Sequence, residues 1–435
     1  MFYRPTHDAT GEMWDTWLYW SEDTFYLYYL ARSSDQWDNI SMATSTDGMN
    51  WTESGPILRK GDGVIWMGTG STWESPHPSA LGKFQMNFSE WKGPRQTIFF
   101  ATSDDLVQWQ RLGDEYEFVQ DERWYEPQGR WDCIWTMPCP GGGLYGYWTA
   151  SPKAETGGRF GFGQSTDGVT WEALPPPKVH GVGEGEVGAI EEIDGKYYMM
   201  FGSNGRMTTL AAEKPEGPFH VTAKNPTLLA GHTYFSRFFP APDGLLANHH
   251  SIARDGHIYM GLLKRAVLDA EGILRLGWWE GNDGLKRQRT AMEIPTADVA
   301  EPGALMLPNA FDLARGLILE CRLSLPPTLF AARRGLYVEY ADDSGTAVLL
   351  DARGRVEFNH TDLVGSIDVV EHRTDREMTF DSPTLLRLVL EHSLMELYLD
   401  DILIECFSLP ASATGRIGLL QGGDTHAFSN LIAWC

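Results

Sequence analysis

The nine residues ATSTDGMNW, at positions 43–51, recur twice further along the chain. The other copies are ATSDDLVQW at 101–109 and GQSTDGVTW at 163–171, so the starts lie 58 and 62 residues apart. Each copy is typical of a strand, a tight turn of the Asp-Gly type and a tryptophan that begins the next strand. A weaker fourth version, TTLAAEKPEGPF, occupies 208–219. A strand–turn–strand unit that returns at a regular step indicates a repeated β-structure.

A second series of aromatic-rich segments precedes these turns. The starts of its five members lie 59, 60, 53 and 61 residues apart: TFYLYYLA (24–31), KFQMNFSE (83–90), GLYGYWTAS (143–151), KYYMMFGSN (196–204) and HIYMGLLK (257–264). Helical periodicity is nearly absent here, and a β-sandwich would not produce the regular step. We therefore predict an all-β fold whose first domain, residues 1–295, is a five-bladed β-propeller.

The composition and pattern of the sequence change after the fifth unit. A linker is expected at 296–310, because the tryptophan-rich pattern stops there. From 317 onward, segments such as LILECRLSL and GLYVEYAD alternate between apolar and polar residues and are broken by turn residues. This pattern predicts an antiparallel β-sandwich at 311–435. It contains few tryptophans and no cluster of catalytic residue types, so we expect a packing domain.

Composition excludes several classes of partner. The chain has 35 Lys and Arg against 59 Asp and Glu, a formal charge of −24, which disfavours nucleic acid and anionic membrane surfaces. No apolar run approaches the roughly 20 residues that span a bilayer. The first residues, MFYRPTHDATGEMWD, lack the layout of a signal peptide, and five cysteines have no framework spacing. We expect a cytoplasmic protein, with any oligomer formed through the β-sandwich.

One polar residue falls on or beside the predicted first strand of each blade. These residues lie 9 to 12 positions before the second residue of the aromatic-rich segment in each unit: Asp15, Glu74, Asp132, Glu186 and His249. The innermost strands of a propeller line a central funnel, so these side chains are predicted to converge. Several stand among aromatic residues, in a chain with 17 Trp, 16 Tyr and 20 Phe. Such rings stack on the apolar faces of sugars.

Carboxylates gathered at the centre of a closed β-structure favour one particular chemistry. Mutual repulsion and partial desolvation separate their pKa values, so that one acid holds a proton while another stays ionised. Glycoside hydrolysis needs this pair: an acid for the leaving oxygen, and a carboxylate as nucleophile or base. The reaction requires no metal and no nucleotide, so we expect no cofactor and an oligosaccharide or glycoside as the substrate.

The chain resembles the five-bladed propeller glycosidases, most closely glycoside hydrolase family 32 with its appended β-sandwich. The family's Trp-Met-Asn-Asp-Pro-Asn-Gly stretch corresponds to MWDTW (13–17), which makes Asp15 the nucleophile. Its Arg-Asp-Pro resembles RWDC (130–133), which makes Asp132 the stabiliser of the transition state. Its Glu-Cys-Pro is similar in place to EVG (186–188), which makes Glu186 the general acid/base. The family's Phe-Ser-Gly-Ser is echoed by MGTGS (67–71).

The resemblance implies a retaining, exo-acting hydrolase of furanosides, most closely of terminal β-fructofuranosyl residues. The motifs depart from the family: the Asn before the nucleophile, the prolines after both aspartates and the Cys after the glutamate are missing. Side chains beside the three acids are expected to contact the sugar: Trp17, Trp66, Ser71, Glu74, Arg130, Trp131, His249 and His250.

Several alternatives stay open from sequence. Glu184 competes with Glu186 for the acid role, with Glu186 favoured by spacing. Glu74 is expected to bind sugar hydroxyls or to replace one of the three acids. His249 and His250 are expected to be structural, to ligate a cation or to bond a sugar hydroxyl. The functional alternatives are a fructotransferase, an inverting arabinofuranosidase-like enzyme and a carbohydrate-binding propeller without catalysis. A phosphorylase is disfavoured, because the funnel strands show little clustering of Arg or Lys.

Overall fold

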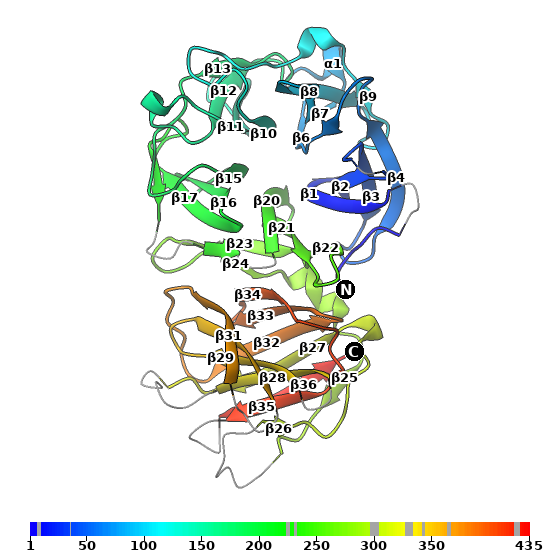
Figure 1. Ribbon diagram of the computed structural model, residues 1–435, viewed down its shortest axis with the longest axis vertical. Coiled ribbons are helices and arrows are strands. Elements are labelled where there is room, and N and C mark those ends of the chain that lie inside the picture. Colours follow the sequence, from blue (N-terminus) through cyan, green and yellow to red (C-terminus); the bar gives the residue numbers. More distant parts are fainter. Residues whose placement is uncertain are drawn as a thin grey trace.

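The computed structural model describes residues 1–6, 10–34, 36–222, 227–229, 233–295, 304–326, 334–341, 344–362, 367–421 and 427–435. Figure 1 shows two bodies, a ring of small sheets and a second body of packed sheets below it. In this part of the chain the helices are short: α1 (Pro78–Leu81) and four 3-10 helices, at Asp114–Tyr116, Ala154–Thr156, Glu280–Leu285 and Leu313–Arg315. No helix among the described residues is long and apolar enough to cross a membrane.

The first three blades are antiparallel sheets whose strands follow chain order. Blade one contains β1 (Glu12–Ser21), β2 (Thr24–Arg32), β3 (Asn39–Ser45) and β4 (Thr52–Arg59). Blade two contains β5 (Trp66–Met67) and β6 (Thr72–Glu74), which both pair with β7 (Phe84–Trp91), then β8 (Gln96–Ser103) and β9 (Gln110–Arg111). Blade three contains β10 (Trp131–Pro138), β11 (Leu144–Ala150), β12 (Gly161–Ser165) and β13 (Glu172–Leu174).

The last two blades carry additional pairings. Blade four contains β15 (Glu186–Ile193), β16 (Lys196–Ser203), β17 (Arg206–Ala212) and β18 (Phe219–Val221), extended by β14 (Val179–His180) and β19 (Thr227–Leu229). Blade five contains β20 (Thr233–Ala241), β21 (Gly244–Ile252), β22 (Ile258–Met260), β23 (Lys264–Leu268) and β24 (Leu274–Trp278). The strands β1, β6, β10, β15 and β20 face the middle of the ring (Figure 1). The predicted five-bladed propeller is confirmed.

The repeated nine-residue sequence forms the hairpin turn between the third and fourth strands of a blade. Asp47, Asp105 and Asp167 each accept hydrogen bonds from the backbone amides two and three residues further on, at 2.7–2.9 Å. The indole nitrogens of Trp109 and Trp171 donate to backbone carbonyls of the same turn, both at 3.0 Å. The side chains of the repeat thus satisfy the turn's own backbone.

The second body is a sandwich of two sheets. One contains β27 (Leu317–Leu323), β32 (Thr384–Glu391), β33 (Leu394–Leu399), β34 (Ile402–Ser408), β36 (Phe428–Trp434) and β25 (Arg289–Ala291). The other contains β26 (Leu305–Met306), β35 (Ile417–Gln421), β28 (Arg334–Ala341), β29 (Ser344–Leu350), β30 (Arg355–Asp362) and β31 (Ile367–Asp375). Leu319 and Leu388 from the first sheet and Val348 from the second are fully or almost fully buried in one apolar core. The predicted sandwich is confirmed.

The two bodies are joined by strand pairing as well as by the chain. Gly277 in β24 pairs with Ile402 in β34, so blade five and one sandwich sheet form a continuous sheet. Residues 289–291, which the predicted boundary at 295 placed in the propeller, pair with the sandwich strand β36. Residues 305–306, predicted as linker, pair with β35. The rest of the predicted linker includes 296–303, outside the described residues; the domain limits stay a prediction.

Candidate active site

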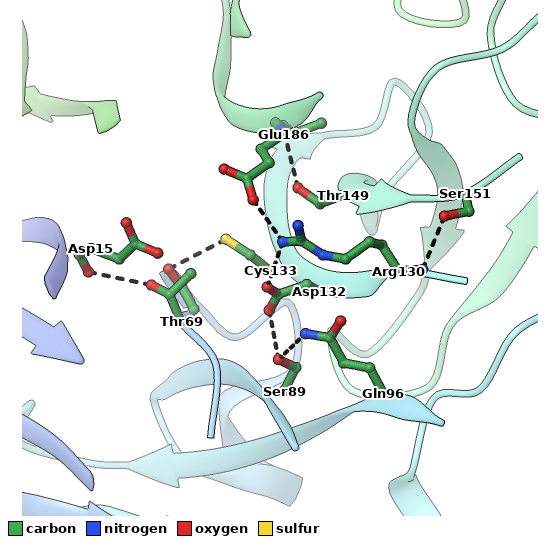
Figure 2. Close-up of polar contacts among 12 residues, drawn as sticks. Asp15, Thr69, Ser89, Gln96, Arg130, Asp132, Cys133, Thr149, Ser151 and Glu186 are labelled. Atoms are coloured by element: carbon green, nitrogen blue, oxygen red, sulfur yellow. Dashed lines mark hydrogen bonds and ion pairs between the residues drawn. The ribbon is translucent and has the colours of Figure 1, made fainter. Parts of the chain in front are cut away.

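Three acidic side chains from three blades meet at one mouth of the ring. Asp15 lies near the start of β1, Asp132 near the start of β10 and Glu186 at the start of β15. Because all three inner strands begin at the same mouth, residues far apart in sequence face one another. Figure 2 shows the carboxylates of these residues directed toward a common space. The structure thus brings together the three acids predicted to be catalytic.

The inner strands share a local irregularity that aims these side chains. The register of β1 against β2 shifts between Trp14 and Thr16, and that of β10 against β11 shifts between Asp132 and Ile134. The skipped residues, Asp15 and Cys133, have φ of 40° and 53°. Strand β15 shifts at the equivalent place, between Val187 and Ala189. Such bulges bend a strand and re-aim its side chains, and they occur next to active sites.

Arg130 connects two of the acids. Its guanidinium lies 2.7 Å from Glu186 Oε1 and 3.3 Å from Asp132 Oδ2 (Figure 2). The hydroxyl of Ser89 donates to the other oxygen of Asp132 at 2.6 Å, and Gln96 donates to Ser89 at 2.9 Å. Asp132 is therefore held from both sides. Its side chain is only 8% exposed, against 27% for Glu186, so Asp132 forms the floor of the site and Glu186 its rim.

Close backbone approach beneath Asp132 requires a glycine. A Cβ on Gly68 would lie 2.2 Å from Ser89 Oγ and 2.9 Å from Asp132 Oδ1. Any side chain at this position would displace the hydrogen bond between Ser89 and Asp132. Next to it, Thr69 donates to the backbone carbonyl of Asp15 at 3.3 Å. The stretch predicted to echo a family motif therefore supports the acids through its backbone and one hydroxyl.

Asp15 has a strongly perturbed ionisation. Burial and the negative charge of Glu186 raise the pKa of the Asp15 carboxyl to about 7, although the nearby charge of Arg237 opposes the shift. Both the protonated and the ionised form of this carboxyl are therefore populated near neutral pH. The site contains three carboxyl groups and the two guanidinium groups of Arg130 and Arg237. Burial and the neighbouring carboxylates outweigh the two guanidinium groups, so the pKa of Asp15 lies above its ordinary value.

His250 borders Asp15, whereas His249 does not. The Nδ1 of His250 lies 4.0 Å from Asp15 Oδ1, and its ring packs on Trp14 with centroids 4.5 Å apart. Burial lowers the pKa of His250 to about 3, so the ring is neutral at pH 7. Adjacent strand residues point to opposite faces, and His249 instead faces the sandwich, with Nε2 3.4 Å from Glu396 Oε1. The predicted sugar contact of His249 is wrong.

The prediction that His249 ligates a cation can be compared with the groups around its ring. His249, Glu396 and Cys406 lie close enough to ligate a metal ion together. However, the ammonium of Lys264 already lies 2.7 Å from Glu396 Oε1, and Tyr398 donates to the other oxygen at 2.5 Å. All of these groups are buried between propeller and sandwich. The positive charge at this place is supplied by the protein itself, so the cluster is an interdomain contact.

Three predicted sugar contacts are buried in packing instead. Trp17 and Trp131 are both 0% exposed and belong to apolar clusters. The bulge at Asp15 breaks the alternation of β1, so Trp17 turns away from the funnel and donates to Thr72 Oγ1 at 3.0 Å. The hydroxyl of buried Ser71 bonds the backbone carbonyl of Ile134. No face of these side chains is free for a sugar, so these predictions are wrong.

Glu74 lies at the opposite mouth of the ring. It lines a cavity of about 520 Å³ with Trp20 and Trp135, at the ends of β1 and β10, and with Glu191 and Pro240. Glu74 differs from the equivalent residues of the other blades because the first strand of blade two is divided into β5 and β6, and the residues between them approach the acids. The predicted role of Glu74 beside the three acids is therefore wrong.

Two predicted candidates remain, Trp66 and Glu184. Trp66 is half-buried and stacks on Trp91, with centroids 5.9 Å apart, and its contact with substrate stays a prediction. Glu184 is exposed before β15, and its carbonyl accepts from Ser203 at 2.8 Å. Of the two competing glutamates, Glu186 is the one ion-paired within the site.

Sequence reasoning missed Tyr234 and Arg237 in β20. The Tyr234 hydroxyl donates to Glu186 Oε2 at 2.6 Å, and Arg237 is fully buried beneath the acids. They were missed because the marker of the fifth unit pointed to His249 in β21, one strand further on. An arginine inside the aromatic run TYFSRFFPA (233–241) was the available signal.

Comparisons with known proteins agree with this architecture. No protein-family model matches the sequence, and no curated protein matches it. Among solved structures, the chain is similar to fructan 1-exohydrolase IIa from Cichorium intybus, with a TM-score of 0.72 and 13% identity over 100% of this chain and 97% of that one. A family 32 β-fructofuranosidase from Bombyx mori gives a TM-score of 0.69 and 14% identity, covering 98% and 91%.

Sucrose-6-phosphate hydrolase from Lactobacillus gasseri is a third similar structure. Its TM-score is 0.69 at 14% identity, covering 98% of this chain and 90% of that one. Identity this low shows a shared fold, and the sharing extends over both bodies of the molecule. The chain thus has the fold of glycoside hydrolase family 32, a five-bladed β-propeller followed by a β-sandwich.

Proposed function

We propose that this protein is a glycoside hydrolase that cleaves terminal furanosides, foremost β-fructofuranosyl linkages, with retention of configuration. The observation that carries the proposal is the convergence of Asp15, Asp132 and Glu186 from three blades around Arg130. Similar structures support the substrate class: one was determined with 1-kestose and another with sucrose. Both ligands contain a fructofuranosyl unit.

The chemistry divides into two displacements. An ionised oxygen of Asp15 attacks the anomeric carbon while the bond from that carbon to the leaving oxygen breaks. Glu186 gives its proton to that oxygen, so the leaving group departs as a neutral alcohol. In the second step the Glu186 carboxylate takes a proton from water. The water oxygen then bonds to the anomeric carbon, and the carboxylate of Asp15 is released.

The surrounding contacts suit these roles. Glu186 stands at the exposed rim, where a leaving group and then water have access. Asp132 is fixed on the floor by Ser89 and Arg130, and a fixed carboxylate binds ring hydroxyls whose bonds strengthen as positive charge develops on the sugar. Asp15 must lose its proton before it attacks, and its pKa of about 7 places this ionisation near neutral pH.

A panel of furanosides tests the proposal. Aryl β-fructofuranosides, sucrose, fructans and α- and β-arabinofuranosides are incubated with the wild type and with Asp15→Asn, Glu186→Gln and Glu74→Gln. We expect fructoside cleavage that falls about 10⁴-fold or more in Asp15→Asn and about 10²–10⁴-fold in Glu186→Gln. Glu74→Gln, at the opposite mouth, should stay within twofold of the wild type.

The same experiment separates the alternatives. Cleavage confined to arabinofuranosides, or release of the inverted anomer in NMR of the first product, would contradict the fructosidase mechanism. Oligosaccharide products longer than the substrate at high sucrose concentration would indicate a transferase. Sugar binding without turnover on any member would indicate a binding propeller. Wild-type rates in Asp15→Asn would end the assignment of the nucleophile.

A further inference from the structure

A fully buried arginine lies directly beneath the three acids. Arg237 is in the middle of β20, and its exposed fraction is 0%. One terminal nitrogen donates to Cys133 Sγ at 2.7 Å and to the backbone carbonyl of Gly188 at 3.3 Å. The other donates to Thr69 Oγ1 at 3.3 Å. These contacts join the guanidinium to the bulged residues of two other inner strands and to the loop of blade two.

This cation has no direct ionic partner. Among the residues that the structure describes, no carboxylate lies within 4.0 Å of the Arg237 guanidinium. Its Nε is buried without a hydrogen-bond partner, and its guanidinium carbon lies 4.9 Å from the centroid of the Phe235 ring. A guanidinium keeps its charge in proteins, and burying a charge is costly unless opposite charges compensate it. The compensation therefore comes from acids slightly further away.

Asp15 is the acid whose pKa is lowered by the charge of Arg237. Arg237 is the strongest of the influences that favour its ionised form, ahead of Arg130, and it acts against burial, Glu186 and Asp132. Two hydrogen bonds also connect Arg237 to the backbone of Asp15. Thr69 accepts from Arg237 and donates to the Asp15 carbonyl, at the residue whose φ is 40°. Charge and backbone geometry at Asp15 thus depend on the same arginine.

We propose that Arg237 is the positioning residue of the nucleophile: a buried cation beneath Asp15 that, through Thr69, holds the bulged backbone of Asp15 in place. The inference rests on the proposed function only where it names Asp15 a nucleophile. The charged and titratable groups around Asp15 come from several elements: Glu186, Asp132, Arg130, Arg237, Cys133, His250 and Tyr234. His250 is neutral, so it does not replace Arg237 as a cation.

The decisive measurement is the titration of Asp15 itself, which needs no substrate. The protein is labelled with ¹³C at the aspartate carboxyl carbons, and Asp15→Asn identifies the Asp15 resonance. We expect Arg237→Met to raise the pKa of Asp15 by about one unit or more, because an adjacent opposite charge is lost. Arg237→Lys keeps the charge and should titrate close to the wild type. In kinetics, the acidic limb of kcat/KM should move upward in parallel.

A matched control is Arg275→Met in the same blade. Arg275 is 2% exposed and pairs with Asp269 at 3.0 Å on β24, so this variant also removes a buried arginine. It should change stability and leave the titration of Asp15 unchanged. If Arg237→Met does not fold, Arg237→Gln removes the charge while keeping two donors. If neither folds, Arg237→Lys decides, since a shift of a full unit with the charge retained would overturn the proposal.

The outcomes of the two proposals are distinguishable. An unchanged pKa of Asp15 in Arg237→Met overturns the inference whatever the enzyme cleaves. A raised pKa of Asp15 without cleavage of any furanoside supports the inference and contradicts the proposed function alone.

Discussion

The hydroxyl of Tyr234 donates a 2.6 Å hydrogen bond to Oε2 of Glu186, from blade five to blade four. This bond aims the carboxyl group assigned as the general acid/base, because Arg130 engages only its other oxygen. Two donors from different blades therefore determine the orientation of Glu186.

Removing this hydroxyl should impair turnover more than binding. Hydrogen bonds to charged groups contribute about 1.5–3 kcal/mol, so Tyr234→Phe is expected to lower kcat by about 10–100-fold. Steady-state kinetics on the preferred furanoside checks this. Tyr147→Phe is the control, since that variant also loses a hydroxyl donor, to the Pro215 carbonyl at 2.9 Å. Equal losses in both variants would contradict a specific role for Tyr234.

The ionisation of Asp15 predicts the dependence of activity on pH. Because the nucleophile must be ionised and the pKa of Asp15 is about 7, kcat/KM should fall as pH decreases through 7. Glu186→Gln removes a negative charge that raises this pKa, so the Asp15 titration should move to lower pH in that variant. Carboxyl ¹³C NMR measures the shift directly. A pKa near 4 for Asp15 in the wild type would contradict the prediction.

The same ionisation affects stability. Asp15 has a pKa of about 7 in the folded protein and about 3.9 when unfolded, so the folded state binds more protons between these values. Its contribution to the free energy of unfolding therefore declines as pH rises from 4 to 7. Asp15→Asn removes this penalty and should be more stable than the wild type at pH 8, by roughly 1–3 kcal/mol. Urea unfolding at pH 4.5 and pH 8 tests the difference.

Arg130 should be required for activity. Arg130→Met leaves Glu186 and Asp132 without their shared cation and removes a charge that favours ionised Asp15. We expect kcat/KM to fall by about 10–100-fold, because hydrogen bonds to charged groups contribute about 1.5–3 kcal/mol and this pair is partly exposed to solvent. Arg123→Met, which breaks an exposed pair with Asp121, should have no effect on kinetics.

The buried contact between the bodies should control stability. Lys264→Met leaves the Glu396 carboxylate buried without its ammonium partner, which typically costs about 3–5 kcal/mol. Lys264 is the largest of the influences that lower the pKa of Glu396, which is about 2 despite burial. The stabilisation is therefore present above pH 4.5 and lost as pH falls toward 2. The double variant Lys264→Met/Glu396→Leu should recover part of the loss in thermal unfolding; no recovery would contradict the pairing.

How much of this could be read from the sequence depends on distance along the chain. The repeated turn is a local structure, closed by Asp47 and its equivalents within a few residues, so its period predicts the blades. The alternating pattern after 317 likewise predicts a sandwich. The three acids could be located because each lies at or near the start of the inner strand of its blade. Trp17 and Glu74 were misassigned because a bulge or a divided strand changes which face a residue occupies, and spacing does not record it. Trp131 is the strand neighbour of Asp132 and therefore points to the opposite face of β10.

The amino-acid sequence by itself determined the architecture, because strand periodicity and turn chemistry act between residues close in the chain, and it predicted which three acids would meet. Only the tertiary structure decided which side chains share a space. From another blade, Tyr234 donates to Glu186 and Arg237 donates to Thr69, which in turn donates to the backbone of Asp15. The charge of Arg237, buried in a low dielectric, also acts across the ring on Asp15, more than two hundred residues away in the chain.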